Sequence, residues 1–221
     1  MSKKMSKSGL AISLSKLKVF EYPKVSKEQY PTDSEIAASV IWNGHILGDI
    51  GGKVIADLGC GTGILGIGAL LLGAKRVYFI DIDKIALEAA KFNVLNAKSE
   101  SSTLGYANFI LGGIKEVNLP KVDVVLQNPP FGTKVKHSDR LFVEKALEIA
   151  HVVYSFHKSE SKAFLKGFAA KKNAKITHIW DFRFPLKASF GFHRRQIHRI
   201  GVSCFRFEKY GDFVDNKNGL D

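Results

Sequence analysis

The four residues Asn128, Pro129, Pro130 and Phe131 have the clearest chemical potential in this sequence. They follow an apolar segment, 122–126, that is predicted to be a buried strand, and an open parallel sheet places its chemistry at the ends of its strands. The Asn128 side-chain oxygen and the Pro129 carbonyl can each accept one hydrogen of a planar amino group, which makes its nitrogen more nucleophilic. Phe131 can stack on the attached ring. The motif alone leaves adenine N6, guanine N2, cytosine N4 and a glutamine amide open as targets.

A glycine-rich turn occupies residues 57–63, between a predicted strand at 54–56 and a predicted helix at 64–72. Glycines in such a turn let a ligand approach the backbone closely, because a Cβ atom would clash with it. A dinucleotide fingerprint would need glycine where this chain has Ile64, which disfavours a nicotinamide cofactor. A zwitterionic ligand fits better, because a carboxylate beside the turn attracts its cationic end. The candidate binding residues here are Asp57, Gly59, Gly61 and Gly63.

A second acidic position follows the next predicted strand, 77–80, where the sequence reads Asp81-Ile82-Asp83. A carboxylate at this place in a nucleoside-binding sheet accepts hydrogen bonds from both ribose hydroxyls. The glycine turn and the acid together indicate a ligand that contains a nucleoside.

The elements that must position these residues alternate between short apolar runs and helical segments, which is typical of a parallel sheet covered on both faces. We predict strands at 54–56, 77–80, 108–111, 122–126 and 151–156, helices at 64–72, 84–96, 138–150 and about 160–171, and a final extended pair at 175–184 and 197–207. The expected fold is α/β: a doubly wound, mostly parallel seven-stranded sheet with helices on both faces and a C-terminal antiparallel hairpin. The expected organisation is an N-terminal extension (1–28), one catalytic domain (29–210) and a short tail (211–221).

Two helices carry more specific predictions. Residues 32–35 have the form of a capping box, with Thr32 as the cap and Glu35 reaching back. The helix at 64–72 is apolar all round, which suits either a core or an interface, and a core is favoured.

Positive charge is concentrated in the C-terminal part of the chain. The formal net charge is +12, and residues 158–210 contain thirteen Lys or Arg against three acids. Aromatic residues are interleaved with these charges, and bases stack on rings while phosphates attract cations, so the pattern favours a nucleic-acid partner. The candidate RNA-contacting residues are Lys134, His157, Lys158, Phe192, His193, Arg194 and Arg195.

The remaining composition argues against several classes. No run reaches the roughly 18 apolar residues of a membrane span, and the first residues lack the apolar centre of a signal peptide, so we expect a cytoplasmic protein. Cys60 and Cys204 have no Cys or His partners at zinc-site spacing, so we predict no metal site and two small buried residues.

Six segments, 28–32, 57–63, 79–83, 127–134, 154–158 and 188–193, resemble the methyltransferase-like protein five family of class I S-adenosylmethionine methyltransferases, in the same order. The resemblance covers nearly residues 28–207. It implies formation of N6-methyladenosine in small-subunit ribosomal RNA, S-adenosylmethionine as methyl donor, and a small zinc-binding activator protein as partner. It also implies that Gln29, Tyr30 and Thr32 help close the cofactor pocket, that the glycine turn holds the methionine part, that Asp81 holds the ribose beside Ile82, and that 128–131 hold the target base.

One position departs from this family. The chain has Gly112-Gly113 after the third strand, where the family usually carries an acid that binds the cofactor's adenine amino group. Losing one hydrogen bond would weaken the affinity several-fold, and a water or Asn108 could substitute.

Two alternatives remain from other classes. A protein glutamine-amide methyltransferase would leave the basic, aromatic C-terminal hairpin unexplained. A non-catalytic RNA-binding protein with the same fold would leave residues 128–131 unexplained.

Overall fold

The computed structural model describes residues 5–19, 32–100, 104–131, 138–186 and 198–211. Its helices are α1 (Lys7–Ser15), α2 (Ser34–Ile46), α3 (Ile64–Leu71), α4 (Lys84–Glu100), α5 (Ser138–Ile149) and α6 (Lys162–Lys171), with a short 3-10 turn at Ser159–Ser161. Its strands are β1 (Val54–Leu58), β2 (Arg76–Asp81), β3 (Tyr106–Leu111), β4 (Val122–Gln127), β5 (Ala150–Lys158), β6 (Ala174–Leu186) and β7 (His198–Lys209). Each strand and helix predicted from residue 53 onward is present, with somewhat different bounds.

The strands form one seven-stranded sheet in the order β3-β2-β1-β4-β5-β7-β6. The first five strands in this order are mutually parallel, whereas β7 pairs antiparallel with both β5 and β6. The doubly wound sheet and its antiparallel C-terminal pair are therefore confirmed. These last two strands do not follow the order of the chain across the sheet, because β7 lies between β5 and β6 and β6 forms the edge.

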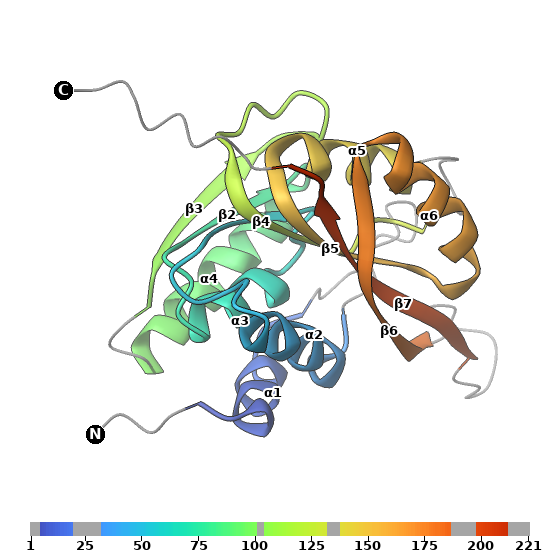
Figure 1. Cartoon of the computed structure of the whole chain (residues 1–221). Coiled ribbons are helices and arrows are strands. Elements are labelled where there is room, and N and C mark those ends of the chain that lie inside the picture. Colours follow the sequence, from blue (N-terminus) through green and yellow to red (C-terminus); the bar gives the residue numbers. More distant parts are fainter. Residues whose placement is uncertain (1–4, 20–31, 101–103, 132–137, 187–197, 212–221) are drawn as a thin grey trace, which may run out of the picture.

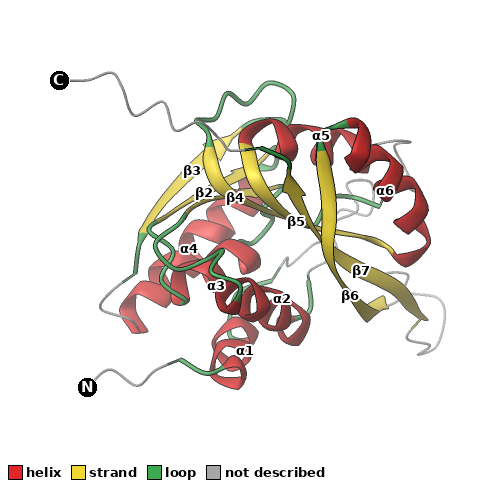
Figure 2. Cartoon of the chain, in the orientation of Figure 1, coloured by secondary structure: helices red, strands yellow, loops and turns green. Residues whose placement is uncertain are grey.

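Helices cover both faces of this sheet (Figures 1 and 2). One face packs against α1, α2, α3 and α4, and the other packs against α5 and α6. Helix α1 belongs to the first layer, since Leu10 and Leu14 are fully or almost fully buried there. Within the described residues, none of the helices is both long enough and apolar enough to span a bilayer.

The start of α2 differs from the prediction. Asp33, and not Thr32, is the N-cap: its side chain accepts hydrogen bonds from the backbone N–H groups of Glu35 and Ile36 at 2.9 and 3.2 Å. A short carboxylate at this position satisfies the free donors of the first turn. The hydroxyl of Thr32 is thereby left for another partner.

The apolar helix α3 is a core element, as favoured from the sequence. Its residues 65–70 are all buried between the sheet and the neighbouring helices. Cys60 and Cys204 are buried free cysteines, as predicted.

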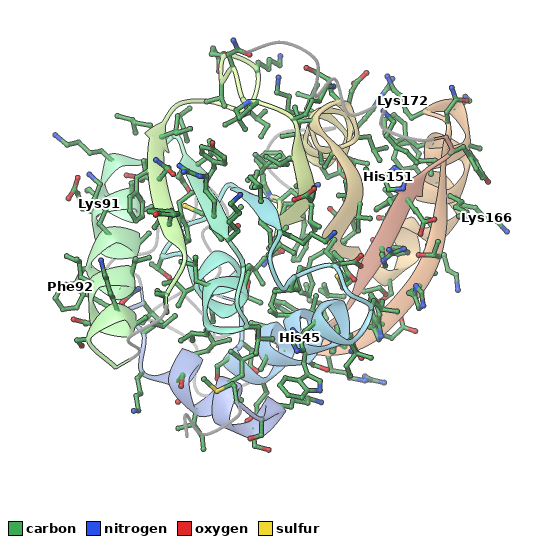
Figure 3. The ribbon with its side chains drawn as sticks, turned by 60° about the vertical axis from the view of Figure 1, so that its left-hand side comes forward. His45, Lys91, Phe92, His151, Lys166 and Lys172 are labelled. Carbon is green, nitrogen blue, oxygen red and sulfur yellow. The ribbon has the colours of Figure 1, made fainter. Side chains whose placement is uncertain are left out.

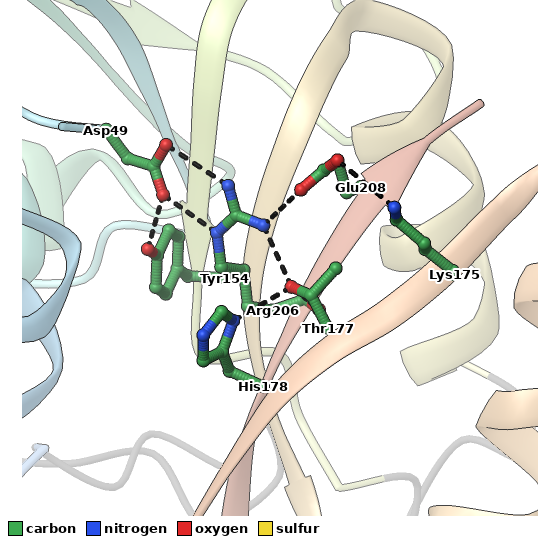
Figure 4. Close-up of polar contacts among 7 residues, drawn as sticks. All are labelled: Asp49, Tyr154, Lys175, Thr177, His178, Arg206 and Glu208. Carbon is green, nitrogen blue, oxygen red and sulfur yellow. Dashed lines mark hydrogen bonds and ion pairs between the residues drawn. The ribbon is translucent and has the colours of Figure 1, made fainter. Parts of the chain in front are cut away.

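A buried polar cluster ties the end of α2 to the antiparallel strands (Figure 4). Asp49, in the loop after α2, accepts hydrogen bonds from Arg206 Nε at 2.8 Å and from the Tyr154 hydroxyl at 2.6 Å. Arg206 also donates to Thr177 and to Glu208. The Asp49 and Arg206 side chains are only 11% and 9% exposed, so Arg206 compensates the buried charge of Asp49, while Arg206 itself is shared between Asp49 and Glu208.

Replacing Asp49 by alanine is expected to lower the free energy of unfolding by about 1–3 kcal/mol, because the Tyr154 hydroxyl loses its acceptor and the buried Arg206 keeps only Glu208 and Thr177 as partners. Chemical denaturation measures this loss. The matched control is Glu88→Ala, which removes an exposed i,i+3 pair with Lys91 and should cost no more than about 0.5 kcal/mol. Equal small losses for both variants would contradict the role given to Asp49.

Candidate active site

The strand register brings three predicted site segments to one edge of the sheet. Leu58, the last residue of β1, pairs with Ile80 of β2 on one side and with Gln127 of β4 on the other. The glycine turn, the acidic segment at 81–83 and the motif at 128–131 therefore leave the sheet side by side. This carboxyl edge is where parallel α/β sheets bind ligands.

The glycine turn adopts a backbone that requires its glycines. Gly59, Gly61 and Gly63 have φ angles of 67°, 55° and 89°, in the left-handed region. A Cβ atom on Gly59 would lie 3.0 Å from the ring of Phe142. The three glycines thus form a left-handed backbone cradle, and the Phe142 ring leaves room only for glycine at position 59.

Asp57 lies beneath this cradle and is 1% exposed. Its carboxylate accepts a hydrogen bond of 2.9 Å from the Gly66 N–H in the first turn of α3. Burial, with a smaller contribution from the nearby Asp81, raises the pKa of Asp57 to about 7 even though the Gly66 hydrogen bond opposes the shift. A neighbouring cation would stabilise the ionised form of a carboxyl with such a pKa. This agrees with the cationic end predicted for the ligand.

Asp81 organises the turn as well as ending β2. One carboxylate oxygen accepts from the Gly61 N–H and the other from the Asp83 N–H, both at 2.8 Å. Asp83 itself is 6% exposed and accepts from the Ile85 N–H at the start of α4. Ile82 between them is 67% exposed, so it presents an apolar surface at the mouth of the site.

Asn128 is held by the residue that was expected to cap α2. Its side-chain N–H donates to the Thr32 hydroxyl at 2.9 Å, so the amide oxygen faces the other way. That oxygen is buried and has no hydrogen-bond partner among the described residues. A buried acceptor without a donor is costly unless a ligand supplies one, and an amino group would. Pro129 is buried beside it, and Phe131 packs partly buried against the core.

A polar relay that the sequence analysis missed lies behind this motif, on the α5 face of the sheet. Gln127 donates to Ser155 at 2.9 Å, Ser155 contacts His157 at 2.7 Å, and His157 lies 3.8 Å from Asp139. The alternation of Ser155 and His157 with aromatic residues along β5 is the signal that indicates it, because side chains two apart share a face.

The predicted RNA-contacting role of His157 is not supported by its position. The side chain is 1% exposed, and burial lowers its pKa despite the opposing contribution of Asp139. It is therefore a neutral member of the relay and not a surface group. The prediction failed because β5 extends to Lys158, beyond the end expected at 156.

Asn93 is a second residue that the sequence analysis missed. It is fully buried on α4, donates to the carbonyls of Lys18 and Thr62 at 2.9 and 3.0 Å, and accepts from the Lys18 N–H at 2.8 Å. It joins the segment after α1 to the glycine turn.

Several predicted site residues lie outside the described part of the chain. They are Gln29, Tyr30, Lys134, Phe192, His193, Arg194 and Arg195. Lys158 is described, at the end of β5, with its side chain 35% exposed and 3.8 Å from Glu160.

Comparisons with known proteins agree with this geometry. A family model described as ribosomal protein L11 methyltransferase matches residues 47–129, which span the glycine turn, the acidic segment and the start of the 128–131 motif. The rRNA N(6)-adenosine-methyltransferase METTL5 of Danio rerio is 36% identical over 85% of this chain and 91% of its own length. The corresponding Drosophila melanogaster protein is 35% identical over 86% and 90%.

A solved structure resembles the whole fold. A candidate RNA methyltransferase from Pyrococcus horikoshii is 41% identical, with a TM-score of 0.80 over 92% of this chain and 98% of that one. The similarity extends along nearly the full length of these relatives and includes the segments that form the carboxyl edge. The chain therefore belongs to the METTL5 family of class I S-adenosylmethionine-dependent methyltransferases.

Proposed function

We propose that this protein transfers a methyl group from S-adenosylmethionine to the N6 amino group of an adenosine in ribosomal RNA. The observation that carries the proposal is the buried, unpartnered Asn128 oxygen, which Thr32 orients away from itself beside the glycine turn. The names of the curated relatives support adenosine in rRNA as the target. We also propose that the substrate is the RNA of the small ribosomal subunit and that the protein acts in the cytoplasm.

The residues of the site supply positioning and hydrogen-bond acceptance. The Asn128 oxygen and the Pro129 carbonyl each accept one amino hydrogen, which localises the nitrogen lone pair, and Phe131 stacks on the base. The bound cofactor supplies an electrophilic methyl group on a sulfonium, a good leaving group. Asn128, Pro129 and Phe131 would hold the amino nitrogen for in-line transfer of this methyl group, with the bonding electron pair staying on sulfur and the amino proton passing to solvent.

The cofactor residues follow the order of the strands. Asp57 would attract the ammonium of the methionine part, and the cradle of Gly59, Gly61 and Gly63 would let that part approach the backbone. Asp81 would accept hydrogen bonds from the ribose, and Ile82 would pack against the nucleoside. The described part of the site fits this cofactor, because it offers a buried carboxylate, a backbone cradle and a second carboxylate in that sequence along the sheet edge.

RNA contacts are proposed for Lys134, Lys158, Phe192, His193, Arg194 and Arg195. The supporting observation is topological: Lys158 ends β5, and the segment from 187 to 197 joins the end of β6 to the start of β7. These ends lie on the carboxyl edge, the same side as Asn128. Target RNA that reaches the site would pass over them.

The small zinc-binding activator implied by the family is proposed to dock on the β3 edge. β3 is an edge strand of the sheet, and large apolar side chains of β3 and α4 are exposed beside it. They are Ile85, Phe92, Leu95, Tyr106 and Leu111. An unpaired strand edge with apolar neighbours suits a protein partner. Figure 3 shows Phe92 and Lys91 projecting from α4 on one side of the molecule, opposite Lys166 and Lys172 at α6.

Asn128→Ala is expected to lower methylation by about a hundred- to a thousandfold, because an acceptor that acts on the reacting nitrogen is removed. The assay uses labelled S-adenosylmethionine and ribosomal RNA from cells that lack the gene, followed by nucleoside analysis. Wild-type protein should produce N6-methyladenosine, and RNA affinity should be equal in the two proteins.

Thr32→Val is the graded control for this mechanism. It removes only the hydrogen bond that orients the amide and should lower kcat about tenfold, whereas Thr32→Ser should retain most activity. Label on protein would favour glutamine-amide methylation, and equal activity of wild type and Asn128→Ala would remove the mechanism.

Affinity for S-adenosylhomocysteine is expected to rise about tenfold between pH 6 and pH 8, because Asp57, with a pKa of about 7, binds the ligand's ammonium as the carboxylate. Below this pKa the carboxyl is protonated and the attraction is lost. Titration calorimetry across this range measures the change. Asp57→Asn keeps an acceptor for the Gly66 N–H and should give a flat profile; a profile as steep as that of the wild type would assign the titration to another group.

Exchanging both Arg194 and Arg195 for glutamate should weaken RNA binding and reduce the slope of its salt dependence by about one for each phosphate that the protein no longer neutralises. Binding curves at several salt concentrations give the slope. Lys91→Glu with Lys98→Glu, on α4, makes the same charge change elsewhere and should leave the slope nearly unchanged. If the two pairs behave alike, RNA binding is not localised to the 187–197 segment.

Phe92→Glu is expected to weaken association with the activator at least tenfold while leaving S-adenosylhomocysteine affinity unchanged, because it places a charge in the apolar face beside β3. Co-purification and titration with the zinc-binding protein measure association. Phe164→Glu on α6 is the matched control, since Phe164 and Phe92 are both 50% exposed. Unchanged association for Phe92→Glu would move the partner away from this face.

A further inference from the structure

The end of β3 adjoins the nucleoside end of the cofactor site. Leu111, the last residue of β3, pairs with Asp81, and the Gly112 N–H donates to the Asp81 carbonyl at 3.0 Å. Ile82 and Gly112-Gly113 therefore adjoin Asp81, where a ribose held by the Asp81 carboxylate would place its base. The groups around Gly113 decide how the base is recognised.

The carboxylate of Glu116 lies directly over Gly113. The chain turns back after β3, with the Val117 N–H donating to the Gly113 carbonyl at 3.0 Å, and this turn folds the Glu116 side chain over the glycine. A Cβ atom built on Gly113 would lie 2.2 Å from Glu116 Oε2 and 3.7 Å from Ile82 Cδ1. The Glu116 carboxylate thus occupies the space in which a side chain at position 113 would begin, next to the exposed Ile82.

Backbone strain does not account for the glycine here, because Gly113 does not have a positive φ, unlike the glycines of the turn at 59–63. Glu116 is exposed, and the end of its side chain is what lies over Gly113. Asn108, the substitute considered from the sequence, is engaged elsewhere, because its side-chain oxygen accepts from Arg76 at 2.7 Å. It also pairs with Tyr78 in the middle of the strand, away from the carboxyl edge.

We propose that Glu116 binds the 6-amino group of the cofactor's adenine with the carboxylate that lies over Gly113, an inference that rests on the cofactor placement in the proposed function. One Glu116 oxygen accepts a hydrogen of the amino group while the base lies against Ile82. The acid that the chain lacks at position 113 is thus supplied from three residues further along the chain.

Binding of S-adenosylhomocysteine tests this, compared with the same ligand carrying hydrogen in place of its 6-amino group. Glu116→Ala should weaken S-adenosylhomocysteine about five- to tenfold and leave the deaminated ligand's affinity unchanged, because only the former has the hydrogen bond to lose. Calorimetry gives both dissociation constants without any methylation. Glu88→Ala, an exposed carboxylate on α4, is the matched control for net charge and should affect neither ligand.

A second variant makes the test independent of the first. Adding Gly113→Asp to Glu116→Ala places an acid at the vacated position and should restore most of the affinity for S-adenosylhomocysteine, whereas Gly113→Asp with Glu116 present should not raise it. Equal weakening of the two ligands by Glu116→Ala, no weakening of S-adenosylhomocysteine, or failure of the double variant to recover would overturn the proposal.

Discussion

The pairing of Leu58 with Ile80 and Gln127 is the constraint on which the site depends. A parallel sheet fixes the ends of neighbouring strands relative to one another, so three segments separated by up to about 70 residues of chain reach one edge together. Slipping one strand by a single residue would turn every side chain on it to the other face. The glycine turn, the acidic segment at 81–83 and the motif at 128–131 are aligned by the same backbone hydrogen bonds that hold the fold together.

The polar groups on this edge are fixed from behind by buried partners. Asp57 is fixed by the first turn of α3, Asp81 by the backbone on either side of it, and Asn128 by Thr32. The Asn128 oxygen keeps no partner within the described residues, so it can accept from a ligand with little reorganisation. Such preorganisation is where much of the rate enhancement of a methyl transfer without a general base must come from.

Most of the fold was predictable, because its periodicities are local. The strands 54–58 and 122–127 are short apolar runs bounded by turn residues, and α4 and α5 repeat at helical spacing. The insertion of β7 between β5 and β6 was not, since pairing order is a long-range property that the extended pattern of 197–207 does not encode. Likewise, the site motifs were visible as spacings, but which hydroxyl would hold the Asn128 amide was not.

The errors at Thr32 and His157 have one physical origin. Both residues were assigned from their own neighbours in the chain, whereas Thr32 contacts Asn128, 96 residues away, and His157 faces Asp139 on α5 as well as Ser155 on its own strand. Glu116 could not be assigned from the sequence for a different reason. Its carboxylate lies over Gly113, only three residues away in the chain, but a glycine pair followed by an acid does not indicate this contact.

The position of β7 also bears on how the molecule folds. Because β7 follows β6 in the chain but lies between β6 and β5, β6 has no strand partner in the sheet and β5 is paired only with β4 until β7 enters. Before that step, β5 exposes a strand edge carrying buried aromatic residues such as Tyr154 and Phe156, and an edge of this kind recruits other chains. Arg206 arrives on the same strand, so Asp49 gains its counter-ion only when the sheet closes. Damage to β7 should therefore appear first as poor soluble yield, with the surviving molecules retaining a normal cofactor edge.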